Sequence, residues 1–331
     1  MPVSPTESAA SASPPSRPPA PLDPAAVVAA LPAAGRVVVV QRTESTSTDL
    51  AAGARTEPGA WPDRSVLVAD HQAAGRGRAG RTWTTPPRAA LTVSVLLRPA
   101  VGADRLGWLP LLAGLATVRA VREVTGVPAA LKWPNDVLVP APDGAEQAGW
   151  GAWRKVAGLL AEVIVPDRPD RPDRPDRPDR PDRPDRPDAP DRSDHHSAPG
   201  ATPAPPAVVV GIGINVSQDA DALPVPTAAS LRTVGAQVDR TELLAALVRH
   251  LVALDDRWRA GDPALPAEVS AVCVTLGTAV RVEMPGGRAV VGTATALADD
   301  GALVVTDAAG RRHEVHAGDV HHLRVEPDPS R

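Results

Sequence analysis

One short segment of this sequence combines glycines with closely spaced positive charges. Residues 71–83 (HQAAGRGRAGRTW) carry Arg76, Arg78 and Arg81, each directly after one of three glycines. Glycine lets backbone N–H groups approach a phosphate closely, and arginine side chains neutralise the charge of that phosphate. The segment therefore predicts a mobile anion-binding loop that manages a reaction at a phosphate.

The same segment also satisfies the Gly-x-Gly-x-x-Gly spacing of the dinucleotide-binding fingerprint. That fingerprint requires a helix directly after the glycines, because the pyrophosphate rests on the helix N-terminus. Here residues 82–87 (TWTTPP) follow, then a strand pattern, and no acidic residue closes a strand about 20 positions on. The dinucleotide interpretation is therefore disfavoured, as is that of a basic loop without function.

A second indication of functional positions comes from residue types that are rare in this chain. The chain has 35 lysines and arginines, of which only Lys132 and Lys155 are lysines, and its only asparagines are Asn135 and Asn215. Arginine is a poor substitute where a compact point charge is required, so the surviving lysines mark positions where no substitute works. All four residues lie in three short segments, which are 132–137 (KWPNDV), 155–162 (KVAGLLAE) and 211–216 (GIGINV).

Composition limits the class of protein. With 331 residues, 43% of them apolar, the chain can form one or two domains with a core. A net charge of −4 gives no reason to expect a nucleic-acid partner. The single cysteine, Cys273, excludes an intrachain disulfide and a cysteine-based metal cluster. Because no apolar run is long enough to span a bilayer and residues 1–20 lack the features of a signal peptide, we expect a cytoplasmic protein without a membrane partner.

Hydrophobic periodicity predicts a mixture of helices and strands. A short helix is expected to begin within residues 44–50, and longer helices over 108–125 and 240–260, the last with Asp239 and Glu242 in a capping-box arrangement. The predicted strands and extended segments are 36–40, 65–69, 90–97, 130–139, 153–165 and 207–215.

The pattern also predicts domain boundaries. Residues 1–33 are rich in Pro, Ala and Ser and are expected to be a disordered tail, and 34–265 form the main domain. Within that domain, residues 166–206 are expected to be a disordered insertion, in which the triplet Arg-Pro-Asp repeats seven times and blocks regular structure. Residues 268–327 contain short alternating runs separated by glycine turns, which indicate a small β-barrel.

Five motifs together resemble those of biotin–protein ligases, in the form without an N-terminal DNA-binding domain. They are 44–47 (ESTS), 72–83 (QAAGRGRAGRTW), 132–136 (KWPND), 155–158 (KVAG) and 211–215 (GIGIN), in the family's order. The resemblance covers about residues 36–326. It implies an α+β fold: a mixed β-sheet with helices packed on it, as in the class II synthetase-like catalytic domain of biotin and lipoate ligases, followed by an SH3-like β-barrel. One departure is Ser47, where the family usually has asparagine, since serine offers one hydroxyl in place of an amide.

The resemblance also implies a reaction in two steps. The carboxylate of biotin attacks the α-phosphate of ATP, and a lysine of a biotin carboxyl carrier domain of an acyl-CoA carboxylase then attacks the resulting biotinyl-AMP. Two anions meet in the first step, which requires fixed positive charge. The expected catalytic residues are Lys155, Arg78 and Lys132, with Lys155 bridging the biotin carboxylate and the α-phosphate. Mg²⁺ is expected on the triphosphate, and the sequence does not identify its ligands.

Site residues carry over from the motifs one by one. Neutral hydrogen-bonding side chains suit the ureido head of biotin, and Trp83 is expected to stack on a ligand, whereas Trp133 is expected in the core. The implied biotin-binding residues are Ser45, Thr46, Ser47, Gln72, Gly75, Arg76, Gly77, Arg78, Lys155, Gly158 and Gly211. The implied ATP-binding residues are Arg78, Arg81, Trp83, Lys132, Asn135, Asp136 and Asn215.

Several alternatives stay open at this point. Gly158 and Gly211 serve either as flat walls along the ligand or for packing, and Asp136 either orients Lys132 or assists Mg²⁺. A lipoate ligase shares the chemistry, and a nucleic-acid-binding module would use the arginines as a basic surface, although the chain has no Phe or Tyr to stack on bases. The sequence does not determine an oligomeric state.

Overall fold

The computed structural model describes residues 19–164, 207–284, 286–316 and 319–322. The predicted insertion at 166–206 and the first 18 residues of the predicted tail lie outside these ranges. Within the described residues, none of the helices combines the length and the apolar character needed to cross a membrane.

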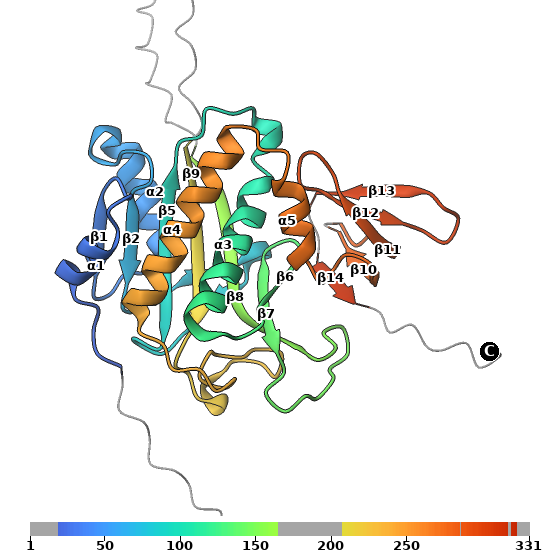
Figure 1. Ribbon diagram of the computed structural model, residues 1–331, viewed down its shortest axis with the longest axis horizontal. Coiled ribbons are helices and arrows are strands. Elements are labelled where there is room, and N and C mark those ends of the chain that lie inside the picture. Colours follow the sequence, from blue (N-terminus) through green and yellow to red (C-terminus); the bar gives the residue numbers. More distant parts are fainter. Residues whose placement is uncertain (1–18, 165–206, 285, 317–318, 323–331) are drawn as a thin grey trace, which may run out of the picture.

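A seven-stranded mixed sheet forms the main domain (Figure 1). Strands β1 and β2 pair in parallel and all other neighbours are antiparallel. The sheet therefore agrees with the mixed sheet expected from the sequence. In spatial order its strands are β1 (Val37–Val40), β2 (Val66–Ala69), β5 (Ala90–Leu97), β9 (Ala207–Asn215), β8 (Trp153–Ile164), β7 (Asp136–Pro140) and β6 (Ala130–Lys132).

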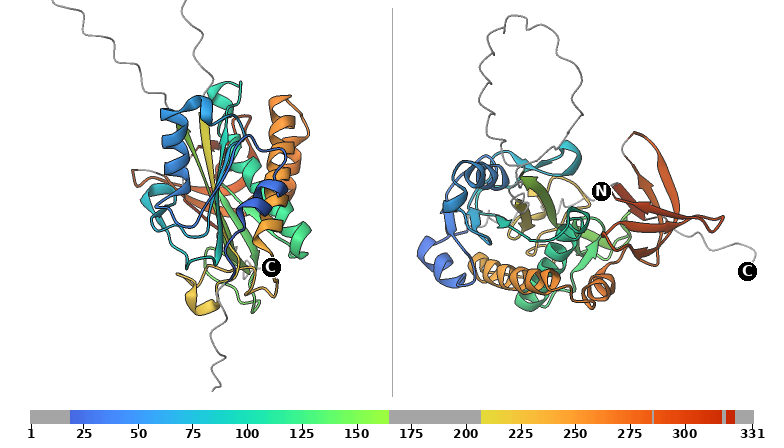
Figure 2. Two further views of the ribbon diagram at one scale, coloured as in Figure 1. Left: turned by 90° about the vertical axis from the view of Figure 1, so that its left-hand side faces the viewer. Right: turned by 90° about the horizontal axis from the view of Figure 1, so that it is seen from above.

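Helices cover both faces of this sheet (Figure 2). On one face, α3 (Trp108–Thr125) and α4 (Arg240–Arg259) pack side by side, with α5 (Leu265–Val272) in contact with both. On the other face lies α2 (Thr46–Thr56), which is shorter and leaves part of the sheet uncovered. Because neighbouring side chains on a strand point to opposite faces, β5 supplies both cores.

The helix predictions agree closely with the structure. The helix predicted over 108–125 has those bounds and ends at Gly126, whose φ of 70° is the left-handed conformation that favours glycine. Asp239 caps α4, since its carboxylate accepts hydrogen bonds from the backbone N–H groups of Thr241 and Glu242.

The N-terminal segment corrects one sequence-based expectation. The assignment of residues 1–33 to a disordered tail is wrong for residues 19–33, because α1 (Pro24–Ala30) packs against α4. Leu22, Val27 and Leu31 are buried in the main core. These three apolar residues dock a segment whose composition otherwise resembles a linker.

A second, five-stranded antiparallel sheet forms the C-terminal domain. Its strand order, β13-β12-β11-β10-β14, confirms the small β-domain expected there, but α5 spans the boundary predicted at 265–268 and the first strand begins at residue 279. The strands are β10 (Ala279–Glu283), β11 (Ala289–Leu297), β12 (Leu303–Thr306), β13 (Arg312–Val315) and β14 (Asp319–His322).

Two tryptophans attach this β-domain to the main domain. Trp108 Nε1 donates to the carbonyl oxygen of Asp299 at 2.7 Å, and Trp133 Nε1 donates to that of Gly301 at 3.1 Å. Trp133 is 2% exposed, which confirms the expectation that it is a core residue. The β-domain is thus fixed beside the β6–β7 turn (Figure 1).

A buried ion pair fastens α4 and the N-terminal segment to β2. Arg240 Nη2 lies 2.7 Å from Asp70 Oδ1, and both side chains are 6% exposed. The same guanidinium donates to the carbonyl oxygen of Ala20, and Asp70 accepts from the backbone N–H of Leu22. One charged pair therefore joins three segments that are distant in the sequence.

Removing the arginine of this pair should destabilise the fold. We expect Arg240→Ala to lower the free energy of unfolding by about 3 kcal/mol, because the carboxylate of Asp70 is left buried without its partner. The measurement is urea unfolding with linear extrapolation. Arg249→Ala is the matched control on α4, since Arg249 and Glu123 form an exposed pair worth at most about 1 kcal/mol. Equal losses in both variants would contradict the role assigned to the buried pair.

Candidate active site

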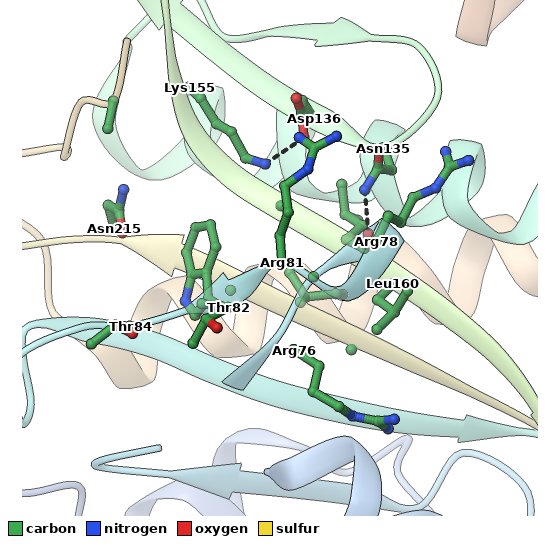
Figure 3. A pocket seen from close by; sticks show the side chains of 18 of the residues that line it. Arg76, Arg78, Arg81, Thr82, Thr84, Asn135, Asp136, Lys155, Leu160 and Asn215 are labelled. Carbon is green, nitrogen blue, oxygen red and sulfur yellow. Dashed lines mark hydrogen bonds and ion pairs between the residues drawn. The ribbon is translucent and has the colours of Figure 1, made fainter. Parts of the chain in front are cut away.

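A cavity of about 470 Å³ lies on the part of the sheet that α2 leaves uncovered (Figure 3). Its walls come from the start of α2, the β6–β7 turn and residues 75–83, which we call the arginine loop. Residues 224–228 and the end of β14 close it on the remaining sides. The cavity thus collects segments from the whole length of the described chain.

Small residues make the floor of the cavity. On β9 and β8, Gly213 pairs directly with Gly158, and Gly211 pairs directly with Ser94 of β5. A Cβ at position 213 would lie 2.7 Å from the indole of Trp83, and one at position 211 would lie 2.4 Å from Ser47 Oγ. Glycine is therefore required for packing at both positions, and the absence of side chains there hollows the sheet.

The arginine loop is a short hairpin. Strand β3 (Gly75–Arg76) pairs with β4 (Thr82–Trp83), and the backbone N–H of Gly77 donates to the carbonyl oxygen of Arg81 at 2.6 Å. The hairpin places Trp83 on the glycine floor. A second strand, and not a long helix, follows the glycines, so the loop lacks the geometry of the dinucleotide fingerprint.

The three arginines of this loop take different directions. Arg78 and Arg81 extend toward the β6–β7 turn, where the guanidinium of Arg81 lies beside Asp136 (Figure 3). Arg76 points away from them and forms an ion pair of 2.7 Å with Glu162. Arg76 borders the cavity, but in this structure its guanidinium is paired with the carboxylate of Glu162.

Both lysines line the cavity, as the hypothesis of a shared cationic site requires. Lys155 Nζ lies 2.6 Å from Asp136 Oδ1 and 5.6 Å from the centre of the Trp83 ring. Lys132 Nζ lies 3.9 Å from the centre of the Trp150 ring. The strands enforce this convergence, because Asp136 pairs with Lys132 on one side and with Gly158 on the other.

Neutral hydrogen-bonding groups gather at the opposite end, below the N-terminus of α2. Ser45 caps α2 by accepting from the N–H of Thr48, and Thr46 contacts Gln72 through both its backbone N–H and its hydroxyl. Ser47 and Ser94 continue this set of polar contacts. All four residues predicted here (Ser45, Thr46, Ser47, Gln72) are buried and line the cavity.

Three predicted residues have structural contacts that sequence reasoning did not supply. Gly75 lies outside the cavity lining and provides room for Gln72 Nε2, which a Cβ would approach to 2.3 Å. Asn215 lines the cavity, but its amide donates to the carbonyl oxygen of Ala229 and accepts from Gln218. Asn135 donates to the carbonyl oxygen of Leu159 at 2.7 Å and so fixes the β6–β7 turn.

The structure also adds residues to the site. Trp150, in the loop between β7 and β8, covers Lys132, and Val320 and His321 of the β-domain line the same cavity. Trp150 is one of seven tryptophans in a chain without Phe or Tyr, which was the one signal available for it. Cys273 is buried away from the cavity, and burial raises the pKa of its thiol, which opposes its use as a nucleophile.

The comparisons with known proteins give the family. Residues 39–168 match the biotin/lipoate A/B protein ligase family, and residues 275–323 match the biotin protein ligase C terminal domain. A biotin–[acetyl-CoA-carboxylase] ligase of Mycobacterium tuberculosis (strain ATCC 25618 / H37Rv) is 39% identical over 86% of this chain and 88% of its own length. The chain therefore belongs to the biotin–protein ligase family.

Two further proteins are similar to this chain, one in sequence and one in fold. A biotin–[acetyl-CoA-carboxylase] ligase of Paracoccus denitrificans is 29% identical and covers 83% of this chain and 95% of its own length. The structure of a biotin protein ligase from Aquifex aeolicus in complex with biotin and ATP superimposes with a TM-score of 0.60 over 87% of this chain and 99% of the other, at 24% identity. This likeness confirms the fold.

Chemical labelling of the two lysines tests the geometry of the cationic end. Lys132 is 5% exposed beneath Trp150, whereas the side chain of Lys155 is 26% exposed. We expect an amine-acylating reagent to modify Lys155 before Lys132, and Trp150→Ala to raise the rate at Lys132 several-fold, as read by peptide mass spectrometry. Trp150→Phe keeps an aromatic cover and serves as the control. Equal labelling of Lys132 with and without the indole would show that Trp150 does not cover it.

Proposed function

We propose that this protein is an ATP-dependent biotin–protein ligase that forms biotinyl-AMP and then transfers biotin to a lysine of a biotin carboxyl carrier domain. The observation that carries the proposal is the division of one cavity into two ends. Ser45, Thr46 and Gln72 supply neutral donors and acceptors at one end, and the two lysines and Arg81 supply positive charge at the other. A ligand with a neutral polar head and an anionic tail fits this division.

Fixed positive charge is what the first step needs. The biotin carboxylate and the α-phosphate repel each other, and negative charge grows at phosphorus as the bond forms. At the cationic end, Lys155 contacts Asp136 and its ammonium faces the ring of Trp83. We infer that its ammonium bridges the carboxylate and the α-phosphate, because a rotatable point charge can follow negative charge from one oxygen to another.

The remaining cations bind the triphosphate in this proposal. Arg78 and Arg81 extend from a glycine-rich hairpin whose backbone can approach phosphate oxygens, and Lys132 lies at the end of β6 and lines the same cavity. Arginine binds phosphate through paired N–H groups. We assign Arg78 and Lys132 to charge stabilisation and Arg81 to binding of the nucleotide.

The indole of Trp83 divides the cavity. It packs against Gly213 and Gly158 on the floor and faces the ammonium of Lys155. A flat aromatic surface at this point can stack on a ligand ring. We therefore assign Trp83 to ligand stacking at the junction of the two substrates.

The cavity can hold a magnesium ion only together with the nucleotide, because the described side chains that line it supply too few oxygen ligands by themselves. Among the described lining residues, Asp136 is the one carboxylate, and the described part of the chain holds no group of three or more His, Cys, Asp or Glu side chains suited to a metal. Mg²⁺ commonly takes one or two carboxylates together with water and phosphate oxygens. Asp136 would therefore hold it, and the ion would neutralise charge on the triphosphate.

The second step requires little of the chain beyond protection of the intermediate. The acceptor lysine attacks the acyl carbon of biotinyl-AMP and AMP leaves, so no enzyme nucleophile takes part. Water must be excluded until the acceptor arrives. We assign this role to the arginine loop, and the need for ATP favours action in the cytoplasm. A lipoate ligase is disfavoured by the match of residues 275–323 to the biotin protein ligase C terminal domain.

Exchange of pyrophosphate into ATP, dependent on biotin, tests the proposal and the role of Lys155 together. We expect wild-type protein to catalyse this exchange with biotin and not with lipoate. Lys155→Ala should lower the exchange rate by about 10²–10³-fold while changing the ATP dissociation constant far less, because the bridging contact is made in the transition state. Arg249→Ala removes a positive charge from the far face and serves as the control. Comparable losses of rate and of ATP affinity would contradict the bridging role.

The arginine loop gives a second test. Its ion pair between Arg76 and Glu162 is partly exposed and contributes at most about 1 kcal/mol, so this contact opposes a rearrangement of the loop only weakly. We expect amide hydrogen exchange over residues 75–82 to slow when biotinyl-AMP is added, while exchange in α4 stays unchanged. Unchanged exchange in the loop would show that it does not close over the intermediate.

A further inference from the structure

Four polar side chains at the neutral end form one continuous set of hydrogen bonds, which we call the hydroxyl chain. Gln72 Oε1 lies 2.9 Å from the backbone N of Thr46 and 3.1 Å from Thr46 Oγ1. Thr46 Oγ1 lies 2.8 Å from Ser94 Oγ, which lies 3.0 Å from Ser47 Oγ. Ser94 has no exposed surface and belongs to none of the sequence motifs.

The direction of every hydrogen bond in this chain is fixed by elementary chemistry. A backbone N–H can only donate, so the Gln72 atom facing it is the amide oxygen. That oxygen can only accept, so the hydroxyl of Thr46 donates its one proton in the hydrogen bond to Gln72. Thr46 must then accept from Ser94, and Ser94 must accept from Ser47. Each hydroxyl therefore donates to the next group in the order Ser47, Ser94, Thr46 and Gln72.

This order determines what the two ends of the chain offer. Ser47 has used its proton and presents only oxygen lone pairs, which accept a hydrogen bond. Gln72 has used its oxygen and presents the amide Nε2 group, which donates. Both residues line the cavity. The neutral end thus has an acceptor and a donor at defined positions, although each hydroxyl taken alone could serve as either.

We propose that Ser94 is a positioning residue that sets this polarity, so that the neutral end selects a cyclic urea and rejects a cyclic guanidine. The proposal rests on the proposed function, since the head of biotin is a cyclic urea. One of its N–H groups donates to Ser47 and its C=O accepts from Gln72. A protonated cyclic guanidine has the same shape but only donors, so its extra N–H meets the N–H of Gln72.

The packing around Ser94 explains how serine serves at position 47. Ser94 pairs directly with Gly211 across β5 and β9, and a Cβ at position 211 would clash with Ser47 Oγ. The glycine therefore lets Ser47 and Ser94 meet. Without Ser94 the hydroxyl of Ser47 would rotate freely and present either a proton or a lone pair to the ligand.

Exchanging the donor at Gln72 tests the polarity directly. Gln72→Glu keeps the two contacts to Thr46 and replaces the donating Nε2 by an accepting oxygen. We expect this variant to lose biotin affinity and gain relative affinity for iminobiotin, the cyclic guanidine analogue, so that the ratio of their dissociation constants changes by about a hundredfold or more. Calorimetric titration of the full-length protein with each compound measures both. An unchanged ratio would overturn the assigned polarity.

A double-mutant cycle tests Ser94 itself. We expect Ser94→Ala to raise the KM for biotin about tenfold with little change in kcat at saturating biotin. In a Ser47→Ala background the same change should add little, because Ser94 acts through the proton of Ser47. Additive losses, or a loss confined to kcat, would show that Ser94 only supports the fold. Ser65→Ala, which removes a buried hydroxyl that donates to the carbonyl oxygen of Pro62 just before β2, is the control for stability.

Failure of this inference is distinguishable from failure of the proposed function. Wild-type protein that catalyses biotin-dependent pyrophosphate exchange, but whose Gln72→Glu and Ser94→Ala variants behave otherwise than stated, overturns the polarity alone. Wild-type protein that neither binds biotin nor catalyses the exchange overturns both.

Discussion

Two anions have to meet in the reaction of this protein, and the convergence of its positive charges on one cavity is the interaction on which the rest of the structure depends. Lys132 and Lys155 come from β6 and β8, the two strands that flank β7, and Arg78 and Arg81 reach them from a hairpin elsewhere in the chain. Asp136 lies among these cations and limits their mutual repulsion. The sheet positions the lysines, whereas the arginines extend from a two-stranded hairpin whose Trp83 packs on the glycine floor.

The cavity exists because one face of the sheet is incomplete. Alternation along β5 and β9 places leucine and valine beneath α2 and then serine and glycine beside it. The apolar positions pack α2 and fix its N-terminus, while the small ones leave room for a ligand and for Trp83. The same two strands therefore pack α2 and form the cavity. The change from large apolar residues to serine and glycine marks where the packed part ends and the cavity begins.

The opposite face is closed and supports the site indirectly. The buried pair of Asp70 and Arg240 joins β2, α4 and the N-terminal segment. Trp108 and Trp133 fix the β-domain by indole hydrogen bonds, so that Val320 and His321 reach the cavity. The cationic end is thus bounded by two domains, which sets the space available to a nucleotide.

By itself, the sequence determined most of the elements and the cations. Periodicity located α3 and α4, because burial of one helix face imposes a regular apolar spacing. The scarcity of lysine and asparagine identified segments that do meet at the site. Only the tertiary structure decided that Arg76 pairs with Glu162, that Asn135 and Asn215 bond to backbone carbonyls, and that Ser94 joins Thr46 and Ser47. These contacts join residues far apart in the chain, and no local pattern records which side chain a fold will place beside another.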